Sequence, residues 1–313
     1  MKNLKKIKGD ASPRKFFRKK YDSYKSIIVY AKENKTKNLL VYDAINKILN
    51  KNNILAPALY SEKYNLSYLE IQDFGNDTVF KILKRKKNNK FSYFKKIVDL
   101  LLKIQSIKNR QVKNFQNKNY IIPKYNEKIL INEAKLFCDW YVKKKLSKSN
   151  RNRFIKKFNI IVKKLTSNLK LKNNVFVHRD FHVSNLMLVN ERIGVIDSQD
   201  ALIGNKAYDL ASLIDDVRFE TSKITKDKVY EYYLKSQKKL DKYKFKNDFE
   251  ILSILRNLKI IGIFTRLAFR DNKKNYLKFI PYAWKLISMR IKKNGTFKDL
   301  RILLTQNFKK QIK

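Results

Sequence analysis

One short segment restricts the possible folds of this chain more than any other. Residues 175–200 read VFVHRDFHVSNLMLVNERIGVIDSQD and contain both histidines of the 313-residue chain. Its apolar runs VFV, LMLV and IGVI have the length and the β-branched content of short strands. Polar residues separate these runs, so the segment predicts a β-hairpin that brings acid, amide and imidazole groups close together.

The polar residues of this hairpin follow the order H-R-D-x-x-x-x-N. His178, Arg179 and Asp180 are followed by Asn185, and a strand-like run then leads to Asp197. This order is typical of the catalytic loops that transfer phosphoryl groups. Such transfer requires an acceptor hydroxyl held in line and a divalent cation that neutralises phosphate charge. We therefore expect Asp180 to be the catalytic base, and Asn185 and Asp197 to supply the oxygen ligands that Mg²⁺ prefers.

The other polar residues of the segment have structural or open roles. We expect His178 to hold the backbone of the loop. His182 either faces the acceptor pocket or orders the loop, and Asp200 supports either the second metal position or the acceptor. A zinc site is not expected, because two histidines without a nearby cysteine lack the usual ligand set.

The residues before this segment predict a small β-rich lobe. Residues 14–31 contain two β-type runs around YDSYK, residues 38–50 have helical apolar spacing, and APALYSEKYNLSYLEIQDFGND adds two strands. After residue 76 the pattern is mainly helical, with candidates at 77–85, 91–106, 127–146, 151–169, 206–217, 226–241, 247–271 and 274–293 and a loop at 107–124. We therefore expect an α+β fold with a small β-rich lobe at 1–75 and a larger helical lobe at 76–313 that holds the catalytic loop.

Composition restricts the class of protein further. The hydrophobic share of 43% permits a real core, and the single cysteine, Cys138, excludes an internal disulfide framework. No apolar window approaches the ~18 residues of a membrane helix, and the N-terminus does not resemble a secretory signal, so we expect a cytoplasmic protein. The net charge of +46 is compatible with a polyanion partner. Lysines are spread along the whole chain, however, which favours a compositional origin.

Several segments together resemble a known superfamily. They are HRDFHVSNLM at 178–187, GVIDSQDALIGNKAYDLASLIDD at 194–216, NEAKLFCDWYVKK at 132–144, RNLKIIGIFTRLAFRDNKKNYLKFIP at 256–281, GDASPRKFFR at 9–18 and LEIQDFGND at 69–77. In this combination the chain resembles the aminoglycoside phosphotransferase/choline kinase superfamily, and within it the bacterial anomeric kinases of N-acetylmuramate and N-acetylglucosamine. The resemblance implies a bilobal, protein-kinase-like fold with a β-rich N-lobe and a larger helical C-lobe.

The resemblance also implies an activity and its partners. The expected reaction moves the γ-phosphate of ATP, with Mg²⁺, to the anomeric hydroxyl of N-acetylmuramate, N-acetylglucosamine or both, in cell-wall sugar recycling. The expected partner is the small sugar, without an obligate protein partner, a specific nucleic acid or a membrane span, and the expected state is a monomer. The alternatives are a kinase of another small acceptor, such as an aminoglycoside, choline or another sugar, and a basic nucleic-acid-binding protein with a degenerate kinase fold.

The family's nucleotide site maps onto two segments of this chain. Adenine would bind backbone groups of the connector near Glu70, Ile71 and Asp73, and the phosphates would meet the first hairpin turn near Ser12 and Arg14. Protein kinases carry a phosphate-binding lysine on the third strand. The corresponding strand here is IIVYA, which has a tyrosine near that place, so Arg14 or Arg18 is the candidate replacement. Relatives usually carry an aromatic residue where this chain has a serine at 198, which predicts a looser local core.

Two residues near the motif are expected to be structural. Only 11 positions separate Asp197 from Tyr208, which is too few for a protein-kinase activation segment. Arg179 therefore has no phosphorylated loop to bind. Asp209 is expected to open a helix and to bond back to the backbone of the catalytic loop.

Two later segments are candidates for the acceptor pocket. Arg256, Lys259, Arg266 and Arg270 have the spacing of one helix face. That face is either solvated or binds an anion such as the lactyl carboxylate of N-acetylmuramate, which arginine suits. The second candidate wall is the segment around Trp140, where the ring would pack on a sugar face and Glu133 or Asp139 would bind hydroxyls.

Overall fold

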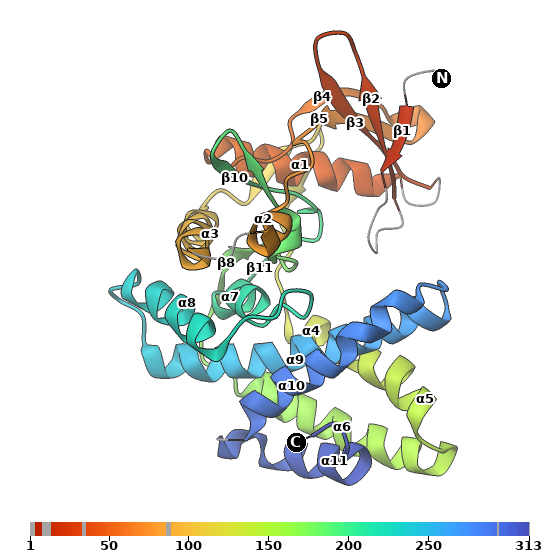
Figure 1. Cartoon of the computed structure of the whole chain (residues 1–313), viewed down its shortest axis with the longest axis vertical. Helices are drawn as coiled ribbons and strands as arrows, with labels where there is room; N and C mark the ends of the chain where they lie inside the picture. Colours follow the sequence, from red (N-terminus) through yellow and green to blue (C-terminus); the bar gives the residue numbers. More distant parts are fainter. Residues whose placement is uncertain (1–3, 8–13, 33–35, 86–88, 293, 313) are drawn as a thin grey trace. The chain divides into compact units, whose positions relative to one another are not determined.

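The computed structural model describes residues 4–7, 14–32, 36–85, 89–292 and 294–312. It has one five-stranded antiparallel sheet and many helices, which confirms the predicted α+β class (Figure 1). The chain divides into two compact units, each made of two segments. The first comprises Met1–Pro123 and Val175–Ile203, and the second comprises Lys124–Asn174 and Gly204–Lys313. The predicted catalytic hairpin therefore belongs to the same unit as the N-terminal sheet.

The sheet of the first unit has the strand order β1-β2-β3-β5-β4. Every neighbouring pair is antiparallel, and the predicted hairpin at 14–31 is formed by the second and third strands. The bounds are β1 Leu4–Ile7, β2 Lys15–Lys20, β3 Lys25–Tyr30, β4 Leu59–Lys63 and β5 Tyr68–Gln72, with a 3₁₀ turn η2 at Tyr64–Leu66. The first of these strands was not predicted from the sequence.

Helix α1 (Lys37–Lys51) covers one face of this sheet. Its Leu39 and Tyr42 form an apolar cluster with Val29, Leu69 and Ile71, all buried. Alternate residues of a strand point to opposite faces of a sheet, so Val29 and Leu69 face the helix while their neighbours face away. The alternation in IIVY and YLEIQ thus fixes where the helix packs.

The rest of the first unit holds the predicted hairpin. Strands β9 (Leu186–Val189) and β10 (Arg192–Val195) pair antiparallel, as the apolar runs LMLV and IGVI predict. This unit also contains α2 Val79–Arg85, α3 Lys90–Gln105 and the 3₁₀ turn η4 Val183–Asn185. Two strands cross the boundary between the units along the chain, β8 Asn173–Val177 and β11 Leu202–Asn205.

The expected loop at 107–124 is partly wrong. Residues Gln111–Lys113 and Asn119–Ile121 pair as a short hairpin, β6 and β7. Each strand has three residues, too few for sequence periodicity to reveal it. Burial of Val112 gives the hairpin its anchor.

The second unit is helical and is organised around α9 (Lys242–Phe269). This long helix packs against α4, α7, α10 and a π-helical turn η3. The bounds of the other elements are α4 Glu127–Leu136, η3 Phe137–Val142, α5 Lys143–Lys145, α6 Lys148–Ser167, α7 Ala207–Ile214, α8 Lys223–Lys235, η5 Lys274–Phe279, α10 Ile280–Ile291, η6 Gly295–Phe297 and α11 Lys298–Phe308. The helices predicted from the sequence are present. Helix α11, the last in the chain, was not predicted.

A glycine permits a close helix crossing in this unit. A Cβ atom at Gly262 would lie 2.2 Å from the carbonyl oxygen of Leu136 and 2.6 Å from the backbone nitrogen of Phe137. The π-helical turn that starts there directs Phe137 and Tyr141 into a buried aromatic cluster with Trp284 and Phe308. No helix in the described part of the chain is long and apolar enough to cross a membrane.

Candidate active site

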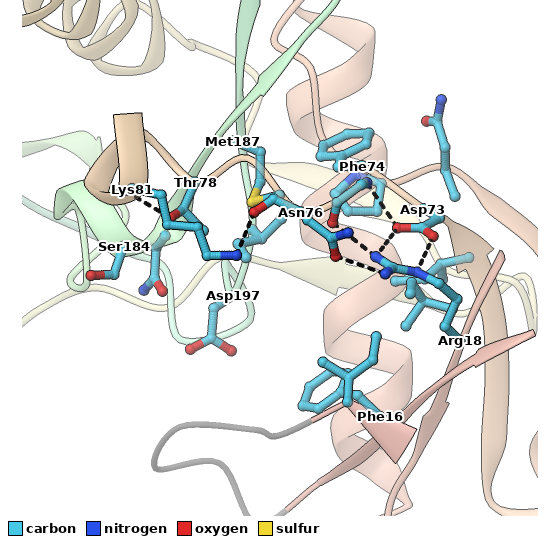
Figure 2. A pocket seen from close by; sticks show the side chains of 18 of the residues that line it. Phe16, Arg18, Asp73, Phe74, Asn76, Thr78, Lys81, Ser184, Met187 and Asp197 are labelled. Atoms are coloured by element: carbon cyan, nitrogen blue, oxygen red, sulfur yellow. Dashed lines mark hydrogen bonds and ion pairs between the residues drawn. The ribbon is translucent and has the colours of Figure 1, made fainter. Parts of the chain in front are cut away.

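A cavity of about 380 Å³ opens in the first unit. Its walls come from the sheet, the connector after β5 and the predicted catalytic hairpin (Figure 2). Among the predicted site residues, the lining includes Ile71, Asp73, Asn185 and Asp197, together with Arg18. Among the described residues, Glu70 and Asp180 are not part of this lining. The fold thus brings the predicted metal ligands and part of the predicted nucleotide connector to one cavity.

Backbone hydrogen bonds hold the catalytic loop in a compact turn. The Asp180 carbonyl accepts from the backbone N–H of His182 at 3.0 Å, and the His182 carbonyl accepts from that of Asn185 at 2.9 Å. The Asn185 side chain donates through Nδ2 to the same Asp180 carbonyl at 3.0 Å. This leaves the amide oxygen of Asn185 as its acceptor end. His182 is buried, and its Nε2 lies 3.5 Å from the Asn185 Nδ2.

His178 connects this turn to the strand that precedes Asp197. The imidazole is completely buried, and its Nε2 lies 3.1 Å from the carbonyl oxygen of Ile196. Burial lowers the pKa of His178, although Asp180, Asp197 and the Ile196 carbonyl oppose that effect. A neutral ring that binds a backbone carbonyl fits the expected supporting role.

Arg179 and Asp197 both have left-handed backbone conformations. Their φ angles are 73° and 62°, which are uncommon for residues with a Cβ atom. Such conformations persist where the surrounding structure imposes them, often in functional sites. The Arg179 guanidinium donates to the carbonyl oxygen of Asp200 at 3.2 Å and lies 3.9 Å from its carboxylate. Arg179 therefore supports the loop after Asp197.

The Asp197 carboxylate is surrounded by polar groups of the first unit. Its Oδ1 accepts from Arg14 Nη2 at 2.8 Å and from Gln199 Nε2 at 3.1 Å. Burial raises the pKa of Asp197; the Arg14 charge opposes this and the Asp180 charge adds to it.

The unusual serine at 198 is tied to the first helix. Ser198 is completely buried, and its hydroxyl donates to the Asn46 side chain at 2.7 Å. Asn46 in turn donates to the carbonyl oxygen of Pro57 at 3.1 Å. This polar chain connects the residue after Asp197 to α1, where the sequence predicted a looser core.

The donor set at this cavity fits a divalent cation bound together with phosphate. Asn185 offers an amide oxygen and Asp197 a carboxylate, and both line the cavity. Within the described residues, no group of three or more His, Cys, Asp or Glu side chains could hold a metal ion alone. Magnesium commonly takes one or two protein ligands and completes its shell with water and substrate phosphates. The Arg14 guanidinium at Asp197 marks a position that attracts positive charge.

The connector after β5 is fixed by an arginine. Arg18 donates to both carboxylate oxygens of Asp73, at 2.5 and 2.8 Å, and also to Asn76 and to the Gly75 carbonyl. Lys81, at the start of α2, lines the same cavity and donates to the Asn76 carbonyl at 2.8 Å (Figure 2). Sequence reasoning missed Lys81. The only available signal was its position four residues after Asp77 at the end of the LEIQDFGND motif.

Glu70 and Ile71 are inner-strand residues. The Glu70 carboxylate accepts from Tyr21 at 2.6 Å and from Ser26 at 2.5 Å. Burial raises the pKa of Glu70, but these hydrogen bonds outweigh it and the pKa is lowered. Ile71 is in register with Ile27 on one side and with β4 on the other, so its backbone is enclosed by the sheet. Ser12 lies outside the described residues.

Part of the predicted acceptor set forms a cluster in the second unit. Lys259 pairs with Glu133 at 2.9 Å, and both side chains are 12% exposed. The other Glu133 oxygen accepts from the hydroxyls of Tyr125 and Tyr208. The structure therefore brings Glu133 and Lys259 together, and it adds two tyrosines that were not predicted.

The remaining predicted residues of the second unit have different environments. Arg256 is only 4% exposed and Asp209 is completely buried in the first turn of α7. Arg270 is exposed and pairs with Asp271 at 2.7 Å. Arg266 and Trp140 are half-buried. The predicted basic face is thus solvated only at its C-terminal end.

Comparisons with known proteins show which family this chain is similar to. The profile of the phosphotransferase enzyme family matches residues 3–244. A relative from Neisseria meningitidis serogroup B, named N-acetylmuramate/N-acetylglucosamine kinase, is 28% identical over 281 residues, which cover 87% of this chain and 81% of the relative. A relative of the same name from Pseudomonas putida is 25% identical over 305 residues, which cover 95% and 86%.

Solved structures agree with the fold. The structure of the gentamicin-APH(2")-IIa complex has a TM-score of 0.62 at 16% identity, covering 94% of this chain and 92% of the other. Amicoumacin kinase hAmiN, in complex with AMP-PNP, Ca²⁺ and Ami, has a TM-score of 0.63 at 12% identity, covering 92% and 89%. These likenesses confirm the predicted kinase-like fold of the aminoglycoside phosphotransferases. With the match over residues 3–244, they show that this chain belongs to the phosphotransferase enzyme family.

Proposed function

We propose that this chain is an ATP-dependent kinase that phosphorylates the anomeric hydroxyl of N-acetylmuramate, N-acetylglucosamine or both. The observation that carries the proposal is that Asn185 and Asp197 line one cavity. It is supported by the match to relatives named as amino-sugar kinases over most of the chain. The cavity of about 380 Å³ is the proposed nucleotide site, with Ile71 and the Asp73 segment beside the adenine. Ser12 and Arg14 are the proposed phosphate contacts.

Each residue of the loop has a defined task in this proposal. Asp180 accepts the proton of the acceptor hydroxyl, which raises the nucleophilicity of that oxygen. Asn185 and Asp197 hold Mg²⁺, which when bound neutralises charge on the transferring phosphate. His178 and Arg179 keep the loop in shape through the Ile196 and Asp200 carbonyls. His182 orders the loop beside Asn185.

The acceptor residues are proposed on the second unit and on Asp200. Glu133, Trp140, Lys259, Arg266 and Arg270 form the proposed sugar-binding set. Arg256 is the proposed partner of the lactyl carboxylate, because it is buried and its Nη1 has no hydrogen-bond partner among the described residues. A buried guanidinium without a partner for one of its nitrogens favours an anionic ligand.

The test is an acceptor panel with labelled ATP, using wild-type protein and Asp180→Asn. We expect phosphate on the two N-acetylated sugars and none on the methyl glycoside of N-acetylglucosamine, whose anomeric hydroxyl is blocked. Asp180→Asn should lower kcat by about 10²- to 10⁴-fold. The matched control is Asp22→Asn in the exposed β2–β3 turn, which should keep full activity.

The same panel separates the alternatives. Transfer only to choline or to aminoglycosides would refute the sugar assignment, and full activity of Asp180→Asn would refute the proposed base. Arg256→Gln should lose N-acetylmuramate phosphorylation while retaining that of N-acetylglucosamine. Equal losses for both sugars would contradict the carboxylate role of Arg256.

A further inference from the structure

An arginine from the far end of the sequence occupies the position beside the proposed metal ligand. Arg14 Nη2 donates to Asp197 Oδ1 at 2.8 Å, although the two residues are 183 positions apart. The Arg14 side chain is only 6% exposed, whereas that of Asp197 is 38% exposed. The Arg14 guanidinium is thus more enclosed than the Asp197 carboxylate, and it is the Asp197 side chain that solvent or a ligand can reach.

Aromatic rings hold this guanidinium in place. Its central carbon lies 5.4 Å from the centre of the Tyr42 ring and 5.8 Å from that of Phe16. Cation–π contacts at these distances favour a positive charge at that position. Phe16, Tyr42 and Asp197 also line the proposed nucleotide cavity, so three contacts of the guanidinium belong to that cavity although Arg14 itself is not part of its lining.

A divalent cation and Arg14 would compete for the same carboxylate. Asp197 Oδ1 already accepts two hydrogen bonds, from Arg14 and Gln199. A metal ion bound to Asp197 would lie close to the guanidinium, and like charges at such a distance repel strongly. Simultaneous occupation is therefore unfavourable, and one cation has to leave.

The nucleotide offers the displaced guanidinium a new partner. Protein kinases use a strand-three lysine at the phosphates, and the third strand here, β3, ends with Tyr30 in that region. Arg18 is already held by Asp73, Asn76 and the Gly75 carbonyl, where it fixes the connector. Arg14 directly precedes β2, whose Phe16 lines the cavity. Guanidinium groups bind phosphate oxygens well because their donors match the phosphate geometry.

We propose that Arg14 is an exchangeable counter-ion: it neutralises Asp197 in the empty site and transfers to the nucleotide phosphates when a divalent cation takes the carboxylate. This rests on the proposed function, because it assumes that Asp197 is a metal ligand. The exchange keeps the charge of the site balanced in both states. It also predicts that loss of Arg14 has opposite effects on metal and on nucleotide.

The experiment measures two affinities separately, without sugar and without turnover. Binding of Mn²⁺ to the nucleotide-free protein is followed by electron paramagnetic resonance, and binding of AMP-PNP in the presence of EDTA by titration calorimetry. Arg14→Gln should bind Mn²⁺ roughly tenfold more tightly and AMP-PNP roughly tenfold more weakly than wild type. Arg14→Lys keeps the charge but not the planar set of donors, so it should restore Mn²⁺ affinity to within about threefold and AMP-PNP affinity only in part.

Two further variants make the result decisive. Lys15→Gln removes one charge from the exposed first residue of β2, next to Arg14, and should change neither affinity. Arg14→Met keeps the apolar stem against Tyr42 and Phe16 and replaces Arg14→Gln if the latter does not fold. Unchanged or weaker Mn²⁺ binding in the neutral variants, or unchanged AMP-PNP binding, would overturn the exchange.

The failure of this inference is distinguishable from that of the proposed function. Asp197→Asn should weaken Mn²⁺ binding by at least tenfold, because it removes the carboxylate ligand. If it does not, the metal assignment is wrong and the exchange falls with it. If it does, and the Arg14 variants behave like wild type, only the exchange is wrong.

Discussion

Two carboxylates of this protein are neutralised by arginine at similar distances but in opposite surroundings. In the first unit, Asp197 is bound by Arg14 at 2.8 Å and stands at a cavity. In the second unit, Asp215 is completely buried and is bound by Arg290 through Nε at 3.0 Å and Nη2 at 3.1 Å. Lys226 and Ser253 complete the cluster around Asp215, at 3.2 and 2.6 Å.

The difference lies in how completely each charge is compensated. Burial alone would raise the pKa of Asp215, but Arg290 and Lys226 lower it to about 2. The pKa of Asp197 is raised, because burial and the neighbouring Asp180 outweigh Arg14. Asp215 is therefore saturated by buried cations of its own chain. Asp197 has a single arginine partner and a partly exposed side chain, and it is the carboxylate at which we propose that one cation replaces another. Similar ion pairs thus serve a structural role in the second unit and, as we propose, a binding role in the first.

The largest expected change in unfolding free energy comes from replacing Asp215 in its cluster with Arg290 and Lys226. Asp215→Asn should lower the free energy of unfolding by about 3–5 kcal/mol, because Arg290 and Lys226 would remain buried without their counter-ion. Urea denaturation measures this value. The same substitution at Asp197 should cost less, because it leaves one buried cation, Arg14, without a counter-ion instead of two. Similar losses for both variants would show that the two sites do not differ in the proposed way.

Lowering the pH should reduce the unfolding free energy through Asp215, by an amount between those of the two substitutions. The folded-state pKa of Asp215 is about 2, below the ordinary value of 3.8, so this group stabilises the fold above pH 4. That contribution, on the order of 2 kcal/mol, should be lost as the pH falls from about 4 to 2. The measurement is the difference in unfolding free energy between wild type and Asp215→Asn as a function of pH. A difference that stays constant over this range would contradict the assignment.

The smallest expected change in unfolding free energy comes from removing Arg14 from its pair with Asp197. Arg14→Gln should change the unfolding free energy by no more than about 1 kcal/mol, because water can hydrate the exposed side of Asp197 once the arginine is gone. Thermal or urea denaturation gives the value, with Lys15→Gln as the control for net charge. A loss of several kcal/mol would mean that Arg14 is a structural cation like Arg290.

The sequence predicts the parts of the site that depend on local order. The hairpin, the compact turn from His178 to Asn185 and the return to Asp197 all lie within 20 residues, so strand patterning and motif spacing suffice. The β-rich start and most helices follow from periodicity in the same way. The short hairpin at 111–121 and the last helix were missed, the former because three-residue strands carry little periodic signal.

Contacts between distant segments could not be predicted from spacing. Glu133 and Lys259 were both candidates, but their ion pair joins residues 126 positions apart. The Asp215 cluster was not predicted, since Arg290 lies 75 positions away on another helix. Ser198 was expected to loosen the core, and its bond to Asn46 depends on where α1 packs. Such partners follow from tertiary packing, which a single sequence does not encode in any local pattern.

The close crossing at Gly262 has a consequence for the Glu133–Lys259 pair. Glu133 precedes Leu136 by three residues, and Lys259 precedes Gly262 by three residues. The ion pair therefore lies about one helical turn from the point where the two backbones nearly touch. A larger residue at 262 would push the two helices apart. Gly262 therefore determines how close the Glu133 carboxylate and the Lys259 ammonium can come, although it contacts neither group.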